Sequence, residues 1–183
     1  MVVSPAVVGG SPLAVVGLDT TTGVPPLITE VAVYHLAGGV ATAGPLVWPV
    51  AVDAPMSEIP HRCRPNMRLA PPWSQVTRYL VVVLARRALV VHDESRLTVL
   101  RRHLPEWEPD RVLHSRDLAE RVWPGLDSYD LGPVTAAVGI HQIPEIAPGA
   151  VAEANAVVML LATLAAEAVR HGERAASARR DPR

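Results

Sequence analysis

One short apolar run constrains the fold of this chain more than any other feature. Residues 13–18 read Leu-Ala-Val-Val-Gly-Leu, and the run ends at Asp19, before a turn over 20–26. A strand that is apolar along its whole length is buried on both faces, so other elements have to cover it from both sides. The run therefore predicts the central strand of a layered sheet, with Asp19 at the end of that strand.

The next two segments predict that the sheet begins with antiparallel strands. Residues 27–36 are rich in β-branched side chains and partly alternate, and Ala37-Gly38-Gly39 separates them from a further strand-like run over 40–50. This is the pattern of a strand, a tight turn and a second strand. We therefore expect three consecutive antiparallel strands at 13–18, 27–36 and 40–50.

Helical spacing replaces the strand pattern after an irregular, Pro- and Arg-rich connection over 51–71. Apolar periodicity and the positions of proline and glycine predict the later elements. The expected strands cover 88–92 and 112–114, and the expected helices cover 73–87, 95–104, 117–123, 131–138 and 151–170. This order is typical of an α/β fold in which helices flank a mixed sheet.

Composition supports one folded domain. The chain has 183 residues, of which 49% are hydrophobic, and a domain of this size can bury a full core. We expect an N-terminal extension over 1–12, one domain over 13–170, and a frayed, flexible, Arg-rich tail over 171–183. The net charge of −1 lacks the broad basic excess of most duplex-binding proteins, so any affinity for nucleic acid has to come from local Arg clusters.

Cysteine usage and hydropathy indicate a cytoplasmic protein. The single cysteine, Cys63, excludes an internal disulfide and is compatible with a reducing compartment. It has no apparent His or Asn partner, so we expect no catalytic role for it. Residues 1–10 lack the basic start of a signal peptide, and the longest later apolar run, 156–166, is too short to cross a bilayer. We therefore expect no membrane partner.

Several segments, in chain order, resemble one family of nucleases. They are Val15–Gly23, Leu27–Gly39, Ala70–Val76, Val90–Asp93, Val112–Ile140 and Pro148–Ala154. Together they are similar to the 3′–5′ exonucleases with an Asp-Glu-Asp-Asp-His signature, a family that includes the proofreading subunit of bacterial replicative DNA polymerase. The resemblance covers 13–168 and implies a ribonuclease-H-like exonuclease fold, which is a five-stranded mixed sheet with helices on both faces.

The resemblance also implies a chemistry whose residues are largely replaced here. In this family four carboxylates hold two divalent ions, Mg²⁺ or Mn²⁺, and a histidine accepts the proton of the attacking water. Asp19 matches the first carboxylate and Glu153 the fourth. Thr21 stands at the spacing of a missing glutamate, Arg96 at that of the third carboxylate, and Pro148 at that of the histidine. We therefore expect efficient two-metal hydrolysis to be lost and no metal cofactor to be required.

Two of these replacements leave alternatives open. After a one-residue shift, Asp93 or Glu94 would supply the third carboxylate, although we favour the interpretation that both cap the following helix. His141 would take over from the lost histidine if its loop folded back. The other histidines have no metal-ligand spacing, and we interpret them as surface or strand-end residues.

The leading functional hypothesis is a catalytically impaired exonuclease-like protein that retains a nucleic-acid or nucleotide-binding fold. Its partner would be an end of single-stranded DNA or RNA, and Arg96 would bind a phosphate where a metal ion once sat. The binding residues would be Thr20, Thr21, Arg96, Arg62 and Arg64, with Arg68, Arg101 and Arg102 extending the basic track. The alternative for each of the flanking arginines is a solvated surface position.

Two further hypotheses belong to other classes. An active, divergent 3′–5′ exonuclease would use Asp19, Glu153 and Asp93 as ligands of Mg²⁺ or Mn²⁺. A subunit that binds a protein partner, with no role in nucleic-acid chemistry, is suggested by the near-zero net charge. Three tryptophans that we expect to be exposed, Trp48, Trp73 and Trp107, would serve that subunit as contacts, and the alternative for Trp73 is an aromatic position of the core.

Overall fold

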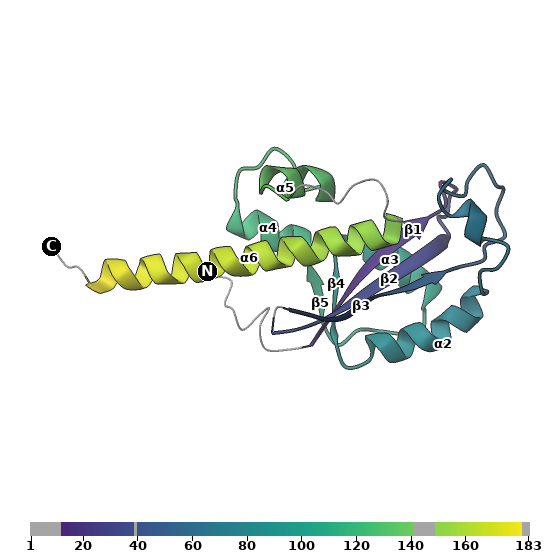
Figure 1. Ribbon diagram of the computed structural model, residues 1–183, viewed down its shortest axis with the longest axis horizontal. Coiled ribbons are helices and arrows are strands. Elements are labelled where there is room, and N and C mark those ends of the chain that lie inside the picture. The colour runs from purple at the N-terminus through teal and green to yellow at the C-terminus, as the bar shows by residue number, and fades with distance from the viewer. Residues whose placement is uncertain (1–11, 39, 141–148, 181–183) are drawn as a thin grey trace.

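The centre of the molecule is one five-stranded mixed sheet. The computed structural model describes residues 12–38, 40–140 and 149–180, and its strand order is β3-β2-β1-β4-β5 (Figure 1). β1 pairs antiparallel with β2, β2 pairs antiparallel with β3, and β4 lies parallel to both β1 and β5. The strands are β1 (Leu13–Thr20), β2 (Ile28–Ala37), β3 (Val40–Pro49), β4 (Ala88–Val91) and β5 (Val112–His114). The predicted mixed sheet is confirmed, including its three leading antiparallel strands.

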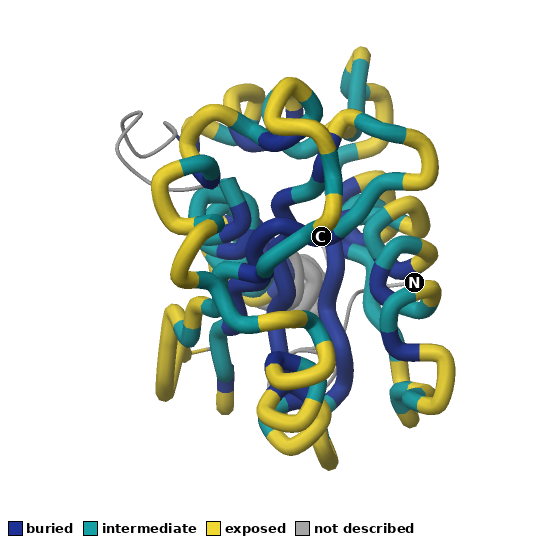
Figure 2. Tube along the Cα trace, turned by 90° about the vertical axis from the view of Figure 1, so that its right-hand side faces the viewer, coloured by how far each residue is buried: buried dark blue, intermediate teal, exposed yellow. Residues whose placement is uncertain are grey.

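Helices cover both faces of this sheet. α2 and α3 pack on one face, whereas α4, α5 and α6 pack on the other. The chain is most continuously buried in the layer between them (Figure 2). The helices are the 3-10 helix η1 (Arg64–Asn66) and the α-helices α2 (Trp73–Leu84), α3 (Glu94–His103), α4 (Ser115–Val122), α5 (Leu131–Ala137) and α6 (Gly149–Arg180).

β1 joins the two layers, as its apolar sequence predicts. Leu13 and Val15 pack toward α6, whereas the residues that alternate with them pack toward α2 and α3. Full burial of one such side chain contributes about 1.5–3 kcal/mol to folding. Gly17 lies on the α6 side, and a Cβ at this position would collide with the backbone of Ala150 and Ala154. The missing side chain therefore lets the start of α6 approach the end of β1.

Two helix C-termini differ from the sequence prediction by three residues or more. α2 ends at Leu84, earlier than the expected end near residue 87, because Arg86 adopts a left-handed backbone conformation with φ 58°. α6 continues to Arg180, whereas a frayed tail was expected from 171. Residues 171–180 are rich in Ala and Arg, and such good helix formers extend an existing helix readily. Residues 181–183 lie outside the described residues.

The first part of α6 forms a long apolar segment. An 18-residue window within Gly149–Arg170 has a mean hydropathy of 1.7, so by length and composition alone this segment is sufficient to cross a membrane. The buried side chains of this segment pack on the sheet in the same core cluster as β1 and β2. Its buried apolar residues are therefore accounted for by the core of this fold.

The expectation of three exposed tryptophans is wrong. Trp48, Trp73 and Trp107 are each partly buried and pack against the core between the sheet and helices α2 and α3. The indole Nε1 of Trp73 also donates a hydrogen bond of 2.7 Å to the carbonyl oxygen of His103. The hypothesis of a partner-binding subunit therefore loses its main contact residues.

Candidate functional site

Three carboxylates converge where β1 ends. Asp19 and Glu30 face one another in the antiparallel β1–β2 pair, so their side chains share one face of the sheet. Glu153 comes from the beginning of α6, which packs on that same face. All three are buried, with 6% of Asp19, 4% of Glu30 and 9% of the Glu153 side chain exposed. Such a cluster requires counter-charges or bound protons, because buried carboxylates repel one another.

Arg62 supplies the counter-charge to Asp19. Its Nε donates to Oδ2 over 2.8 Å and its Nη2 donates to Oδ1 over 2.7 Å, so the pair is bidentate. The thiol of Cys63 adds a hydrogen bond of 3.1 Å to Oδ2. Burial, together with this hydrogen bond, raises the pKa of the Cys63 thiol to about 12. Cys63 is therefore a neutral donor that orients Asp19, in agreement with the expectation that it is not a nucleophile.

The loop after β3 brings Arg62 to the site through its buried neighbours. Ile59 and Cys63 are each 3% exposed, and the amide of Cys63 closes a turn onto the carbonyl oxygen of Pro60 over 2.9 Å. These anchors hold Arg62 between them against the first residue of α6, Gly149, where a Cβ would collide with the guanidinium group. Sequence reasoning placed Arg62 on a phosphate track, whereas the structure places it on Asp19.

Arg96 supplies the counter-charge to Glu153. The Nε of Arg96 lies 3.0 Å from Oε1 of Glu153, although within the described part of the chain that oxygen accepts no well-aligned hydrogen bond. Burial raises the pKa of Glu153 to about 7, and the positive charge of Arg96 limits the rise. Two of the positions singled out from the sequence are thus brought into direct contact.

Glu30 is the site residue that sequence reasoning missed. One of its oxygens, Oε1, is buried with no hydrogen-bond partner among the described residues. Burial and the neighbouring charge of Asp19 raise the pKa of Glu30, whereas a backbone hydrogen bond from Ala150 and the charge of Arg62 oppose the rise. The available signal was a single acidic residue in the middle of a predominantly apolar strand.

Thr21 does not take the place of the missing glutamate. The alternation of β1 predicted its side chain on the same face as Asp19, but the register shifts between Asp19 and Thr20. Thr21 consequently lies in the turn, where its Oγ1 accepts a hydrogen bond of 3.0 Å from the amide of Leu27. Its role is to close the β1–β2 connection, and it does not line the cleft, whereas Thr20 does.

Asp93 caps α3, as the capping interpretation predicted, whereas Glu94 is the first residue of that helix and makes no capping hydrogen bond among the described residues. Asp93 is the N-cap, and its Oδ1 accepts hydrogen bonds from the amide of Arg96 over 3.2 Å and from the hydroxyl of Ser95 over 2.6 Å. Burial favours a higher pKa for Asp93, but these hydrogen bonds hold its pKa below the usual value. Glu94 makes an ion pair with Arg101. Both carboxylates are therefore engaged within the chain.

His92, at the end of β4, is committed to structural hydrogen bonds. Its ring is 4% exposed, its Nε2 lies 3.0 Å from the carbonyl oxygen of Tyr129, and its Nδ1 lies 2.9 Å from the hydroxyl of Ser115. A carbonyl only accepts, so Nε2 carries the proton and Nδ1 accepts from the hydroxyl. Burial lowers the pKa of His92, so the ring is held neutral with neither nitrogen available as a base. Pro148 and His141, the other positions considered for the base, lie outside the described residues.

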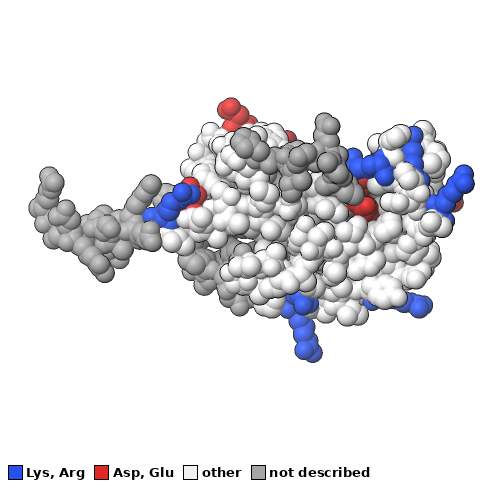
Figure 3. Space-filling model, in the orientation of Figure 1, with Lys and Arg blue, Asp and Glu red and all other residues white. Residues whose placement is uncertain are grey.

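The two arginine–carboxylate pairs line one open cleft of about 380 Å³. Figure 3 shows basic side chains beside an acidic spot at the end of the molecule where α6 begins. Arg62 and Arg96 are the arginines among the described residues of its wall. The other arginines of the expected track do not line it; Arg64, for example, donates to the carbonyl oxygen of Ile59 over 3.0 Å. The cleft is lined by Leu18, Asp19, Thr20, Arg62, His92, Asp93, Arg96, Asp130, Leu131, Gly149 and Glu153.

This donor set does not fit a pair of divalent ions. Asp19 and Glu153 each face a guanidinium group, and a fixed positive charge a few ångströms from a metal position is repulsive. Asp93 is occupied as a helix cap. Within the described residues, no group of three or more His, Cys, Asp or Glu side chains has the arrangement of a metal site. In this arrangement the cleft is suited to polar and charge-assisted hydrogen bonding.

Comparison with solved structures finds the same fold in nucleases. A crystal structure of E. coli Exonuclease I in complex with a dT13 oligonucleotide has a TM-score of 0.71 and 12% identity, over 90% of this chain and 43% of that one. The zinc-bound form of an E. coli Exonuclease I–single-stranded DNA complex has a TM-score of 0.65 and 15% identity. The match covers 84% of this chain and 40% of that one. Exonuclease X in complex with 5′ overhanging duplex DNA has a TM-score of 0.55 and 18% identity. The match covers 85% of this chain and 99% of that one.

These likenesses confirm the expected ribonuclease-H-like exonuclease fold. The chain spans less than half the length of the Exonuclease I chains that it matches. No protein-family model and no curated protein sequence matches it.

Proposed function

We propose that this protein is a catalytically impaired, exonuclease-like protein that binds an end of single-stranded DNA or RNA without divalent metal ions. The observation that supports this most directly is the neutralisation of both remaining carboxylates by arginine. Arg62 pairs with Asp19, and Arg96 pairs with Glu153. Each pair fixes a positive group inside a cleft where the resemblance implies a metal ion.

The arginines retain hydrogen-bond donors for a ligand. Arg62 uses Nε and Nη2 on Asp19, and Arg96 directs Nε toward Glu153, which leaves further guanidinium N–H groups on each. Guanidinium groups recognise phosphate through charge-assisted hydrogen bonds. Half of the Arg62 side chain and a third of the Arg96 side chain are exposed, so a phosphate from solvent can reach both.

Binding of a 5′-labelled single-stranded oligonucleotide, followed by fluorescence anisotropy, tests the proposal. We expect the same affinity in EDTA and in Mg²⁺, and a loss of about tenfold for Arg96→Ala, the effect of one charge-assisted hydrogen bond. Arg102→Ala is the matched control, because Arg102 lies on the same helix, is exposed and does not line the cleft. Binding that requires Mg²⁺, or equal losses in both variants, would contradict the proposal.

An active, divergent 3′–5′ exonuclease is the second candidate, and one observation favours it. Among the described residues, the buried Oε1 of Glu30 has no hydrogen-bond partner, and Glu30 lies opposite Asp19 in the β1–β2 pair, so a third carboxylate is beside Asp19. A metal ion could bind Asp19 and Glu153 only if Arg62 and Arg96 moved away from these carboxylates. Laddering of labelled single-stranded DNA or RNA in Mg²⁺ or Mn²⁺, abolished by Asp19→Ala, would establish this candidate in place of the first.

A further inference from the structure

One side of α6 is covered by the rest of the fold, and the opposite side is apolar and exposed. Within its most apolar 18-residue window, 33% is buried. The exposed residues of α6 between 149 and 170 are Met159, Ala162, Ala166, Val169 and Arg170, of which only the last is charged. Met159 is 36% exposed and Val169 is 48% exposed. In Figure 3, the middle of the face that α6 crosses shows no charged side chain among the described residues. The described part of the chain therefore leaves this apolar helix face uncovered.

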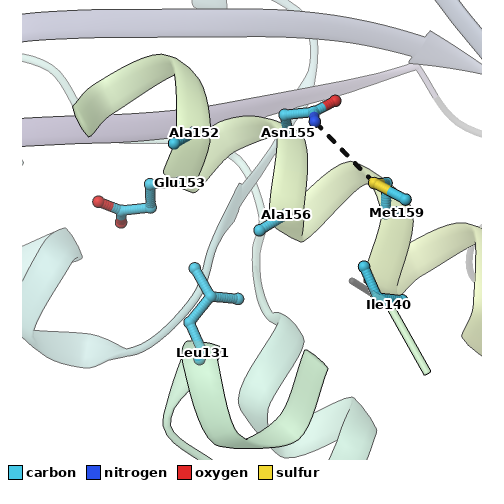
Figure 4. A pocket seen from close by; sticks show the side chains of 8 residues that line it. Leu131, Ile140, Ala152, Glu153, Asn155, Ala156 and Met159 are labelled. Atoms are coloured by element: carbon cyan, nitrogen blue, oxygen red, sulfur yellow. Dashed lines mark hydrogen bonds between the residues drawn. The ribbon is translucent and has the colours of Figure 1, made fainter. Parts of the chain in front are cut away.

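The four apolar residues, which we call the α6 seam, have the spacing of a coiled-coil contact. Met159, Ala162, Ala166 and Val169 follow one another at intervals of three, four and three residues. This is the a and d spacing of a heptad, which forms a narrow line along one side of a helix. Asn155 extends the line by one turn, and its amide lies 3.9 Å from Sδ of Met159 (Figure 4). A line of this width suits a second helix, whereas a helix that packs on a sheet presents a broader apolar face.

We propose that the α6 seam pairs with the α6 seam of a second copy of this chain, with the two helices antiparallel about a twofold axis. Such an interface is self-complementary, since the same surface occurs on both copies. In a pair centred at residue 164, Ala162 faces Ala166 of the second copy, and Met159 faces Val169 of the second copy. The alanines at the centre permit close approach of the two backbones, and the longer side chains fill the space on either side. Every layer of the contact is therefore apolar.

Charge favours the antiparallel arrangement. Residues 170–180 of α6 contain four arginines and one acidic residue. The first turns of α6 lie at the ion-pair cleft, whose wall includes Asp19, Asp130 and Glu153. In the antiparallel pair, the last turns of α6, which project past the sheet (Figure 1), run alongside the start of α6 of the second copy. Opposite charges then approach one another, whereas a parallel pair would place two arginine-rich ends side by side.

Sedimentation equilibrium of the full chain tests the pairing. We expect the wild-type protein to form a reversible dimer that dissociates in the micromolar range, because one helix pair makes a small interface. Ala162→Glu places two unpaired charges at the centre of the contact and should weaken the dimer by about 100-fold or more. Ala85→Glu is the matched control, since it makes the same change at an exposed position at the end of α2, on the opposite face of the sheet. Equal Tm values for the two variants would show that both are folded.

Disulfide cross-linking tests the orientation. Met159→Cys and Val169→Cys should each give no cross-linked dimer alone and should form one when the two variants are mixed and oxidised. The native Cys63 is 3% exposed and does not interfere. Cross-linking of Met159→Cys with itself would show a parallel pair and overturn the arrangement. A wild-type protein that stays monomeric, a dimer that Ala162→Glu leaves unchanged, or binding of the α6 seam to phospholipid vesicles in place of dimerisation would overturn the inference. None of these outcomes bears on nucleic-acid binding, which the anisotropy measurement tests separately.

Discussion

Gly149 and Arg62 fit together because one of them has no side chain. A Cβ on Gly149 would collide with the guanidinium group of Arg62 that holds Asp19. The first residue of α6 and a loop residue 87 positions earlier in the chain are therefore matched in shape. The pairing of Asp19 with an arginine depends on this match as well as on charge.

Gly149→Ala should displace the guanidinium end of Arg62 and destabilise the protein by up to about 1 kcal/mol. This loss of stability is smaller than the loss from breaking a fully buried ion pair, because half of the Arg62 side chain is exposed to solvent. Urea denaturation of a double-mutant cycle checks this. In the Arg62→Ala background, Gly149→Ala should be neutral or stabilising, because alanine is the better helix former. Additive losses would show that the two residues are not coupled.

Divalent ions should not stabilise the wild-type protein, whose buried carboxylates already have counter-charges. In the double variant Arg62→Ala, Arg96→Ala, three buried carboxylates lose both guanidinium partners and repel one another. We expect Mn²⁺ to raise the Tm of that variant and not that of the wild type, with Arg68→Ala, Arg102→Ala as the control. A rise in the Tm of the wild type would contradict the assignment of the arginines as permanent counter-charges.

Thr21→Glu should not restore a metal site, although Thr21 stands at the spacing where the family resemblance implies the missing glutamate. The Thr21 hydroxyl accepts a hydrogen bond from the amide of Leu27, so its loss leaves a donor unpaired at a cost of about 1–3 kcal/mol. We expect Thr21→Glu to lower the urea midpoint without conferring Mn²⁺ binding in calorimetry, and Thr21→Ser to preserve the midpoint. Tight Mn²⁺ binding by Thr21→Glu would mean that its side chain reaches the cleft.

The sheet was predictable because its signals are local. The apolar run that forms β1 and the turn before β3 specify burial and chain reversal within a few residues. The full length of α6 was not predictable in the same way. Its C-terminal part lacks the apolar pattern that marked the first turns, and its helical state follows from propensity and from continuation of a helix already formed.

The site was only half predictable, because its contacts depend on geometry between distant segments. Asp19, Glu153 and Arg96 could be selected by motif spacing, and the structure brings them to one cleft. Glu30 faces Asp19 only through the β1–β2 register, and a register is set by cross-strand pairing that a single strand does not display. Arg62 reaches Asp19 from an irregular loop whose path depends on buried anchors, so its partner could not be derived from spacing.

The raised pKa of Glu153 makes its contribution to stability dependent on pH. Its ordinary value is 4.5 and its value in the folded protein is about 7, so the unfolded chain releases this proton at lower pH than the folded chain does. The stabilisation is fully present below pH 4.5 and is lost as pH rises through 7, by about 3 kcal/mol at most. His35 and His92 have lowered pKa values and act in the opposite sense, so the wild-type curve alone does not isolate Glu153.

Glu153→Gln isolates this contribution, because all other titrating groups are common to both proteins. We expect the unfolding free energy of Glu153→Gln, relative to wild type, to rise by up to about 3 kcal/mol between pH 5 and pH 8, measured by urea denaturation. Glu108→Gln serves as the control, since 69% of that side chain is exposed. If the difference in unfolding free energy between Glu153→Gln and wild type stays constant across this pH range, Glu153 is ionised throughout and Arg96 compensates its burial completely.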